Sequence, residues 1–470
     1  MNKCIRISKE KPIPEDRKAY AEAVFSLVGG KGYKCFVQTF GCQQNDADSE
    51  RIAGMAAEMG YSITDTPEEA DLIVVNTCAV REHAEKKALS LIGQYKHCKN
   101  NKKELIIAVC GCMPSQEHRA DEIKHKYPYV DFTFGTSDLY MLPELLYRRL
   151  SGAKRTFIIP EDRPPVVEDI PVVRESNYRA WVSIMYGCNN FCSYCIVPYV
   201  RGRERSRHPD AIETEVRQLI AEGYKDITLL GQNVNSYGRG CDFGCDFADL
   251  LERLSSIEGD YKLHFMTSHP KDATKKLIDV MARNERIARQ FHLPLQSGSS
   301  EMLRKMNRGY TAEKYIEILD YIKEKLPDAT LSTDIIVAFP GETEEDFKKT
   351  LELLEYVKYD MVFSFIYSPR NGTPAAKMED VVPDDVKADR MRRLLDLQTE
   401  IADSLNAKCL GKTYRVICQG QSKNNAGMLE GRTEGNKILL FASDTAREGD
   451  YVNVKVTKTH AYALYGEEVK

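Results

Sequence analysis

The 470-residue sequence predicts an α/β fold class in three parts. These are an N-terminal parallel, doubly wound sheet, a central incomplete TIM-like (β/α)6 barrel, and a small C-terminal OB-like β-barrel. The first two parts alternate apolar, β-favouring runs with segments of helical periodicity, which is the pattern of parallel sheets. The last part has short β-rich runs separated by Gly and Asn, which is typical of a small closed barrel.

Shifts in composition predict where these parts begin and end. Residues 1–32 are charged and weakly patterned, with one possible helix from Pro14 to Val28, so we expect a loosely attached N-terminal arm. A proline-rich stretch, with Pro160, Pro164, Pro165 and Pro171, predicts an extended linker. The predicted division is therefore an arm (1–32), a first α/β domain (33–151), a linker (152–176), a central core (177–406) and a C-terminal module (407–470).

Three apolar runs in the first domain predict parallel strands, and a cysteine follows or closes each of them. The runs are Tyr33–Phe40, Asp71–Thr77 and Leu105–Cys110, and helical patterns follow at Asp46–Met59, Arg81–Tyr95 and Pro114–Lys126. The cysteines are Cys42, Cys78 and Cys112. Because ligands of such sheets bind beyond the carboxyl ends of the strands, the three thiols should converge. The alternative is three unrelated free cysteines.

The central region repeats the strand–helix unit six times, which predicts an incomplete barrel with right-handed crossovers. The strand candidates are Ala180–Tyr186, Asp226–Gln232, Lys262–Thr267, Gln290–Leu295, Thr330–Ala338 and Met361–Tyr367. In the C-terminal module the candidates are Thr413–Cys418, Ile438–Phe441 and Tyr451–Thr459. A cysteine-rich loop follows the first strand of the core, at the carboxyl end where barrel active sites lie.

That loop carries Cys188, Cys192 and Cys195 in a C-x3-C-x2-C spacing. Three thiolates on one short loop can bind three irons of a four-iron, four-sulfur cluster and leave the fourth iron open. The alternative is a zinc knuckle. Zinc sites favour C-x2-C pairs and four ligands, and no fourth Cys or His lies nearby in the sequence.

Together the two cysteine triads resemble those of the radical S-adenosylmethionine (SAM) methylthiotransferases, and the resemblance extends from Tyr33 to the C-terminus. The segment Cys195–Arg207 is similar to the branch that modifies tRNA, as are Leu230–Asn235, His292–Ser299 and Thr333–Thr343. One departure is Ala338, where the family usually has Gly, and we expect little consequence. The resemblance implies a SAM-binding 4Fe–4S cluster on Cys188, Cys192 and Cys195 and an auxiliary 4Fe–4S cluster on Cys42, Cys78 and Cys112.

The activity that the resemblance implies is methylthiolation of carbon 2 of N6-isopentenyl-adenosine at position 37 of tRNA. One SAM would methylate a sulfur at the auxiliary cluster, and cleavage of another would give the 5′-deoxyadenosyl radical that removes hydrogen from the base. The implied partners are the tRNA anticodon stem-loop, an electron donor such as flavodoxin or ferredoxin, and a sulfur or iron–sulfur carrier. Alternatives are threonylcarbamoyl-adenosine in tRNA, a ribosomal-protein side chain, or a non-catalytic iron–sulfur RNA-binding scaffold.

Polar residues near the ends of the core strands are candidates for binding SAM. They are Gln232, Asn233, Ser297 and Asp334, and Tyr194 resembles the family's aromatic contact to the adenine of SAM. The alternatives are capping of the loops for the polar residues and core packing for Tyr194.

Positive charge is concentrated in two segments of a chain whose net charge is −4. The C-terminal module resembles the TRAM-like RNA-binding domain and has ten Lys or Arg against seven Asp or Glu in Lys408–Lys470. We expect RNA-phosphate contacts from Arg415, Arg432 and Lys437, and from Arg201 and Arg203 after the cysteine loop. The alternative for the arginines is ion pairing within the protein. Deleting the module should leave the cluster-binding core intact.

The composition also bounds the class of protein. Fourteen cysteines are too sparse for a disulfide scaffold, and their cluster-type spacing argues for a reducing, cytoplasmic location. No run of 18 apolar residues is present, so the sequence predicts no membrane span. Acidic residues interrupt the N-terminus, so it does not read as a signal peptide.

Overall fold

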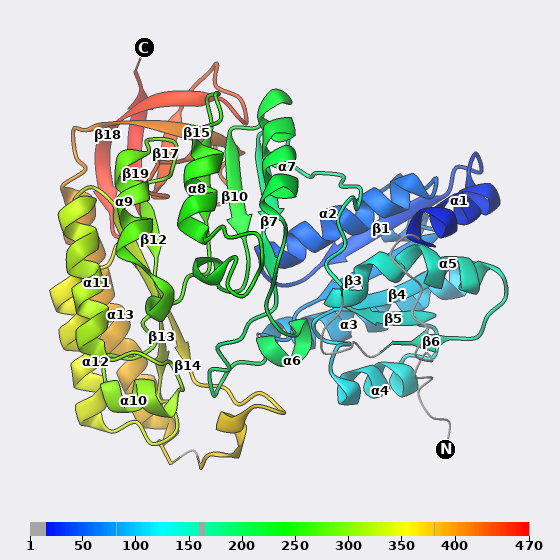
Figure 1. Cartoon of the computed structure of the whole chain (residues 1–470), viewed down its shortest axis with the longest axis horizontal. Helices are drawn as coiled ribbons and strands as arrows, with labels where there is room; N and C mark the ends of the chain where they lie inside the picture. Colours follow the sequence, from blue (N-terminus) through cyan, green and yellow to red (C-terminus); the bar gives the residue numbers. More distant parts are fainter. Residues whose placement is uncertain (1–15, 81, 159–164, 380, 470) are drawn as a thin grey trace. The chain divides into compact units, whose positions relative to one another are not determined.

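The computed structural model describes residues 16–80, 82–158, 165–379 and 381–469, which form two compact units (Figure 1). Unit 1 comprises Met1–Glu175, Met185–Asn189 and Cys195–Arg207, and unit 2 comprises Ser176–Ile184, Asn190–Tyr194 and His208–Lys470. Residues 1–15 and 159–164, with the start of the expected helix and two of the linker prolines, lie outside the described residues. Within the described parts, no helix is both long and apolar enough to cross a membrane.

Unit 1 is built on a six-stranded parallel sheet in the order β2-β1-β3-β4-β5-β6. Its strands are β1 (Lys34–Thr39), β2 (Ser62–Ile63), β3 (Leu72–Thr77), β4 (Ile106–Gly111), β5 (Phe132–Gly135) and β6 (Thr156–Phe157). The three predicted runs form β1, β3 and β4, and every residue of β3 and β4 is buried. Strands buried on both faces need a cover on each side, and the helices provide it.

Helices pack on both faces of this sheet, so it is doubly wound as predicted (Figure 1). One face carries α1 (Asp16–Val28), α2 (Gln43–Glu58) and α5 (Leu142–Leu150), and the other carries α3 (Glu82–Asn101) and α4 (Glu117–Lys126). Val74 of β3 faces the first group, and its neighbours Ile73 and Val75 face the second. This alternation is the two-residue period of a strand.

The N-terminal helix corrects our expectation of a loose arm. Ala21, Val24 and Val28 of α1 are at most 1% exposed and belong to the core of unit 1, and Arg17 forms an ion pair with Glu58 of α2. The buried positions follow helical spacing, but the charged residues between them masked this short apolar stripe in the sequence. The described part of the linker is also attached, because Val173 donates its N–H to the Glu50 carbonyl at 3.0 Å.

Unit 2 contains six parallel strands in an open (β/α)6 arrangement, as the fold-class prediction stated. They are β7 (Arg179–Ser183), β10 (Asp226–Leu230), β11 (Lys262–Phe265), β12 (Gln290–His292), β13 (Thr330–Val337) and β14 (Met361–Ile366). They form two sheets, β7-β10-β11 and β12-β13-β14, which the parallel bridge between Leu263 and Ile287 connects. Strand β14 ends the row, so the barrel is incomplete.

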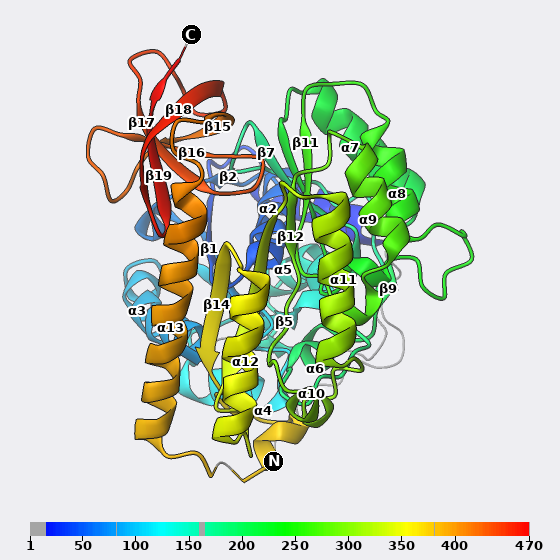
Figure 2. The ribbon, with the colours of Figure 1, turned by 90° about the vertical axis from the view of Figure 1, so that its left-hand side faces the viewer.

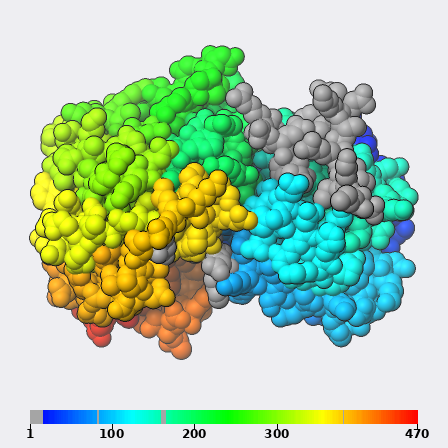
Figure 3. Space-filling view, turned by 90° about the horizontal axis from the view of Figure 1, so that it is seen from below, coloured from blue at the N-terminus to red at the C-terminus, as the bar shows by residue number. Residues whose placement is uncertain are grey.

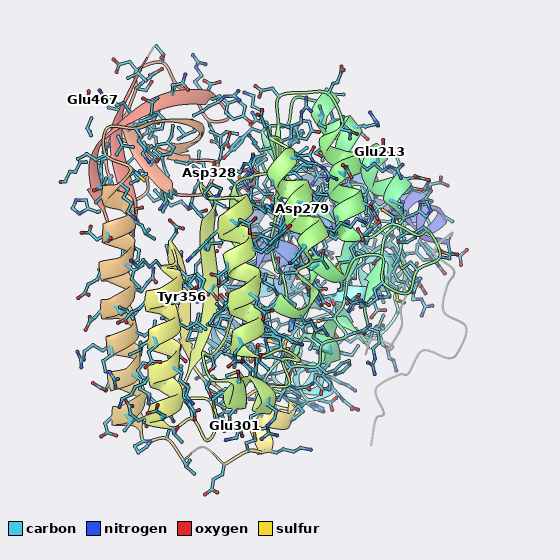
Figure 4. All side chains as sticks on the ribbon, turned by 60° about the vertical axis from the view of Figure 1, so that its left-hand side comes forward. Glu213, Asp279, Glu301, Asp328, Tyr356 and Glu467 are labelled. Atoms are coloured by element: carbon cyan, nitrogen blue, oxygen red, sulfur yellow. The ribbon has the colours of Figure 1, made fainter. Side chains whose placement is uncertain are left out.

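An outer layer of helices covers this sheet. It contains α7 (Pro209–Ala221), α8 (Phe247–Ser255), α9 (Lys275–Arg283), α10 (Ser300–Lys305), α11 (Ala312–Lys325), α12 (Glu344–Val357) and α13 (Asp384–Ala407). Tyr321 of α11 donates to Asp279 of α9 at 2.7 Å, and Tyr356 of α12 donates to Asp320 of α11 at 3.0 Å. Figure 4 labels Asp279 and Tyr356 on their helices. Glu344 pairs with arginines of α13, and the surfaces of α12 and α13 adjoin (Figure 3).

The C-terminal segment is a closed five-stranded barrel in the order β15-β16-β17-β19-β18 (Figure 2). Its strands are β15 (Thr413–Gln421), β16 (Leu429–Arg432), β17 (Ile438–Ala442), β18 (Tyr451–His460) and β19 (Ala463–Glu468). The sequence predicted β15, β17 and β18 but missed β16 and β19, which are short and contain Gly431 and Gly466. Gly466 is required by packing, because a Cβ there would lie 2.4 Å from the Lys455 carbonyl oxygen.

This barrel docks against the amino-terminal ends of the core strands. Five of its contacts fall immediately before or at the start of β7, β10, β11, β13 and β14. They are Gly449 beside the Tyr178 ring, Lys225 Nζ with the Gly449 carbonyl at 2.7 Å, Arg415 with Asp260 at 2.6 Å, Thr330 Oγ1 with the Gly435 carbonyl at 2.6 Å, and Lys437 with Asp360 at 2.5 Å. The barrel therefore closes the end of the core opposite to the cysteine-rich loop.

The three expected RNA contacts of the barrel have partners inside unit 2. Arg415 is stacked on Tyr451 at 3.6 Å and paired with Asp260, and Lys437 is held between Asp360 and Asn406. Arg432 is mostly buried and donates to Gln419 and to the Asn436 carbonyl. Arg415 and Lys437 connect the barrel to the core, whereas the acceptors of Arg432 lie within the barrel itself. Our expectation that the cluster-binding core stays intact without the module stays a prediction.

Replacing Lys437 by Met should lower the stability of unit 2 by about 2 kcal/mol, because Asp360 is left half-buried without its cation. The matched control is Lys423→Met, at an exposed position of the same barrel. Thermal unfolding and the rate of tryptic cleavage of the C-terminal segment report the effect. The docking interpretation is wrong if both variants behave like the parent protein.

Candidate active site

The three cysteines of unit 1 converge as the strand prediction required. Cys42 begins α2 after β1, Cys78 follows β3, and Cys112 follows β4. A Cβ on Gly41 would lie 3.0 Å from the Cβ of Cys78, and the Cys78 and Cys42 thiols both act on the titration of Cys112. Cys78 and Cys112 are buried, and Cys42 is exposed. The triad therefore lies at one edge of the sheet, on three adjacent strands.

The environment of this triad suits a bound cationic group. Burial raises the pKa of the Cys112 thiol to about 12, Arg201 opposes the rise, and Cys78 and Cys42 add to it. Three neighbouring thiols ionise together only when a metal compensates their charge. In the described part of the chain, no three His, Cys, Asp or Glu side chains are grouped closely enough to hold a single metal ion. A four-iron cluster is larger, because each thiolate binds a different iron.

Two asparagines that the sequence analysis missed hold the strand ends together. Asn45 donates to the Asn76 side chain at 3.1 Å and to the Thr77 carbonyl at 3.0 Å, and Asn76 donates to Ser49 at 2.9 Å. Both asparagines are fully buried. Gly111 packs so closely that a Cβ there would lie 2.3 Å from the Thr77 carbonyl oxygen. This network fixes the loops that carry the triad.

Arg201 is buried against the same triad. It lies on α6 (Val197–Arg201), donates to Asp48 at 3.0 Å and to Asn45 at 3.2 Å, and is 5% exposed. Burial alone lowers the pKa of its guanidinium, but Cys112 and Asp48 outweigh burial and leave that pKa raised. The expected RNA contact of Arg201 is therefore wrong, because the side chain is enclosed. Arg203 is exposed.

The segment around Arg201 connects the cysteine-rich loop to the triad of unit 1. Ile196, the residue after Cys195, packs with Val200 against Ala79 and Cys112. Thr136 donates its hydroxyl to the Val200 carbonyl at 3.1 Å. The chain that leaves the loop is thereby fixed within unit 1.

The middle of the loop is held by unit 2. Cys192 is 6% exposed, and its sulfur accepts from Arg308 Nη1 at 3.4 Å. Ser193 donates its N–H to the Met306 carbonyl at 2.9 Å and its hydroxyl to the Lys305 carbonyl at 2.9 Å. The guanidinium of Arg308 therefore places a buried positive charge beside the Cys192 sulfur.

Buried polar atoms without partners mark the carboxyl ends of β10 and β11. Six such atoms have no hydrogen-bond partner among the described residues: Gln232 Oε1, Asn233 Oδ1, Asn235 Nδ2 and Oδ1, Ser268 Oγ and His269 Nε2. An unpaired buried polar atom costs about 1–3 kcal/mol, so a group of them indicates a ligand. Gln232 and Asn233 were predicted here. Asn235, Ser268 and His269 were missed, although the run Thr267–Pro270 follows a predicted strand.

The environment of His269 favours the neutral form of its ring. Burial, and then the positive charge of Arg308, lowers its pKa. Its Nδ1 lies 3.3 Å from the Lys271 backbone N–H and accepts from it, so Nε2 carries the proton and is a free donor. The ring lies 5.6 Å from that of Tyr310, whose hydroxyl accepts from Arg308 at 3.2 Å. These contacts connect the unpartnered atoms to the residue that binds Cys192.

Residues with a strained backbone lie at the same carboxyl edge of the core sheet. Thr267, Gln296 and Ala338 follow β11, β12 and β13 and have positive φ angles of 73°, 76° and 58°. Such angles cost a residue with a Cβ about 1 kcal/mol and cluster at functional sites. Ala338, where the resemblance predicts Gly, has a conformation that glycine adopts without this cost, and our expectation of little consequence stays a prediction.

The remaining candidates differ in what they contact. Tyr194 accepts from Arg308 at 3.3 Å and packs edge-on against Phe339. Ser297 is fully buried and accepts from the Ser299 N–H at 3.2 Å, which is the loop-capping alternative. Asp334 lies 3.6 Å from His292 Nε2 and remains partly exposed.

Three family models match consecutive parts of the chain. Residues 34–135 match an uncharacterized protein family, UPF0004, residues 182–354 match the radical SAM superfamily, and residues 407–469 match the TRAM domain. These parts correspond to the parallel sheet of unit 1, to most of the (β/α)6 sheet with its helices, and to the closed barrel.

Curated relatives match nearly the whole chain. A tRNA-2-methylthio-N(6)-dimethylallyladenosine synthase of Clostridium botulinum (strain Alaska E43) is 49% identical over 93% of this chain and 95% of the relative. An enzyme of the same name from Thermoanaerobacter sp. (strain X514) is 48% identical over 94% of each chain.

Solved structures support the fold at low identity. The radical SAM methyltransferase TsrM from Kitasatospora setae, with cobalamin and a 4Fe–4S cluster bound, has a TM-score of 0.54 and 13% identity over 73% of this chain and 74% of its own. The cobalamin-dependent SAM radical enzyme OxsB has a TM-score of 0.51 and 14% identity, over 78% and 56%.

Replacing Arg201 by Met should destabilise unit 1 by about 3 kcal/mol, because Asp48 is 1% exposed and would keep an uncompensated charge. The double variant Arg201→Met/Asp48→Asn should recover part of the loss. Arg203→Met, two residues away and exposed, is the control. Urea unfolding of the iron-free protein measures all three, and equal midpoints for Arg201→Met and Arg203→Met would contradict the assignment.

Proposed function

The chain belongs to the family of tRNA-2-methylthio-N(6)-dimethylallyladenosine synthases, and we propose that it methylthiolates carbon 2 of N6-isopentenyl-adenosine at position 37 of tRNA. As a member of this family it is a radical SAM methylthiotransferase, an enzyme that uses SAM and 4Fe–4S chemistry. The observation that carries the proposal is the convergence of Cys42, Cys78 and Cys112, since an auxiliary cluster site distinguishes a sulfur-transfer enzyme from a radical enzyme with one cluster.

We assign the SAM-binding cluster to Cys188, Cys192 and Cys195 and the auxiliary cluster to Cys42, Cys78 and Cys112. When bound, the first cluster supplies the electron that cleaves SAM and starts the radical reaction. The protein contributes soft thiolate ligands in both places. Arg308 beside Cys192 and Arg201 beside Cys112 each place a buried positive charge at one thiol, and at Cys112 this charge opposes the rise in pKa that burial causes.

The unpartnered atoms at the ends of β10 and β11 supply the polar contacts of the SAM site. Gln232 Oε1 and Asn233 Oδ1 are acceptors that suit ribose hydroxyls or the amino group of SAM, and His269 Nε2 is a donor that suits its carboxylate. The Asn233 amide is oriented by Asp272, to which it donates at 2.7 Å. Tyr194 remains the proposed adenine contact. Ser297 and Asp334 have less support, given their internal partners.

We assign the proposed RNA-binding surface to cations of the barrel that do not contact the core. Lys455 and Lys458 are exposed on β18. Lys458 Nζ lies 5.7 Å from the Tyr465 ring centre, and His460 packs edge-on against the same ring. Aromatic rings flanked by cations suit the bases and phosphates of a single-stranded loop. Arg203 is a further proposed phosphate contact.

The reaction needs partners that the chain does not contain. An electron donor such as flavodoxin or ferredoxin must reduce the SAM-binding cluster, and a sulfur or iron–sulfur carrier must replace the sulfur that each turnover consumes. Both requirements, with the cluster-type spacing of the cysteines, support a cytoplasmic location for the proposed reaction.

The direct test is the nucleoside content of tRNA. A strain that lacks its own enzyme should regain 2-methylthio-N6-isopentenyl-adenosine when this chain is expressed, as measured by mass spectrometry of digested tRNA. Methylthiolation of threonylcarbamoyl-adenosine instead, or of no nucleoside, would reject the proposed substrate.

The division of labour between the triads gives a quantitative prediction. The reconstituted chain should bind about eight irons, and replacing Cys188, Cys192 and Cys195 by Ala should leave about half. Cys42→Ala should still form 5′-deoxyadenosine but no methylthiolated tRNA. Cys409→Ala, in the C-terminal barrel, is the control and should retain both activities. An iron content near four in the parent chain, or methylthio transfer by Cys42→Ala, would refute the assignment.

A further inference from the structure

Two aromatic side chains on the last core strand are exposed beyond what is usual for phenylalanine. Phe363 and Phe365 of β14 are 44% and 41% exposed. They are two residues apart on one strand, so they project from the same face of the sheet. Adjacent exposed apolar side chains of this size commonly mark a binding site.

The register identifies that face as the inner one. Phe363 is paired with Asp334 of β13, and Phe365 with Ile336. On β13, Asp334 and Ile336 alternate with Thr333, Ile335 and Val337, which are buried under the helical layer. Asp334 and Ile336 therefore face the interior of the open barrel. The ring of His292, from β12, lies 5.9 Å from that of Phe363. The two phenylalanines therefore line the barrel interior at its open edge.

This apolar face continues toward the SAM site. Ile336 packs with Tyr194 against the buried cluster of Met302, Met306 and Phe339. Tyr194 directly precedes Cys195, so the strip of Phe363, Phe365 and Ile336 leads to the loop on which SAM cleavage is proposed.

We propose that Phe363, Phe365 and Ile336 form the subsite that receives the dimethylallyl group of the substrate adenosine. This inference rests on the proposed function, whose substrate carries a five-carbon apolar chain on N6. Asp334, the register neighbour of Phe363, matches the single N–H that remains on N6 beside that chain. The subsite would therefore recognise the N6 hydrogen-bond donor and the adjoining dimethylallyl chain together.

The same face disfavours the main alternative substrate. Threonylcarbamoyl-adenosine carries a carboxylate and a hydroxyl where the dimethylallyl group has only carbon. A carboxylate placed between two phenylalanines and beside Asp334 would lose its hydration and meet a like charge. The strip thus accounts for specificity as well as affinity.

The test compares two anticodon stem-loops, one with N6-dimethylallyladenosine and one with unmodified adenosine at the target position. Fluorescence anisotropy gives the affinity of the iron-loaded full-length enzyme for each. Phe363→Ala and Phe365→Ala should each reduce the preference for the dimethylallyl stem-loop about tenfold, with Phe365→Leu close to the parent. Phe25→Ala is the control, because Phe25 is 53% exposed on α1.

The readouts separate the subsite from the proposed function. Formation of 5′-deoxyadenosine without RNA should be unchanged in every variant, which shows that the core is folded and binds SAM. An unaltered preference in the double alanine variant, or an equal loss of both stem-loops, would overturn the subsite. A parent enzyme that prefers the dimethylallyl stem-loop but makes no methylthiolated product would refute the proposed function and leave the subsite standing.

Discussion

The buried ion pair between Arg201 and Asp48 is the constraint on which the N-terminal site depends. Its cation comes from the segment that leaves the cysteine-rich loop, and its anion comes from α2, whose N-cap is Cys42. Both side chains are almost fully enclosed, so each is stable there only because the other is present. The pair therefore couples the position of α6 to the packing of the triad, and it leaves a positive charge beside Cys112.

Parallel strands explain why both candidate sites form from residues far apart in the sequence. In each unit the strands end at one edge, where backbone groups are no longer paired within the sheet and loops can present side chains. Unit 1 uses that edge for three thiols, and unit 2 uses it for amides, a histidine and strained backbone. The sheets align the ends of the strands, and the loops that follow carry the side chains of the candidate sites.

The sequence predicted the features that depend on local pattern. The apolar runs that form β1, β3 and β4 are continuous, and the cysteines at their ends have a simple geometric consequence, so the convergence was predictable. Helix α1 was misjudged because burial of Ala21, Val24 and Val28 depends on tertiary packing. The ion pairs of Arg201, Arg415 and Lys437 were not predicted for a related reason: charge is visible in a sequence, but its partner, Asp48, Asp260 or Asp360, is distant.

The docking of the terminal barrel has a genetic consequence. Its contacts reach the starts of five core strands. The amino-terminal ends of these strands therefore stay uncovered until the last segment of the chain has been synthesised and folded. A stop codon between Lys408 and Lys470 would remove the partners of the groups at these strand starts, including Asp260 and Asp360. Such alleles should therefore lower the stability of the core as well as remove the barrel, and substitutions are the cleaner route to variants altered in RNA recognition alone.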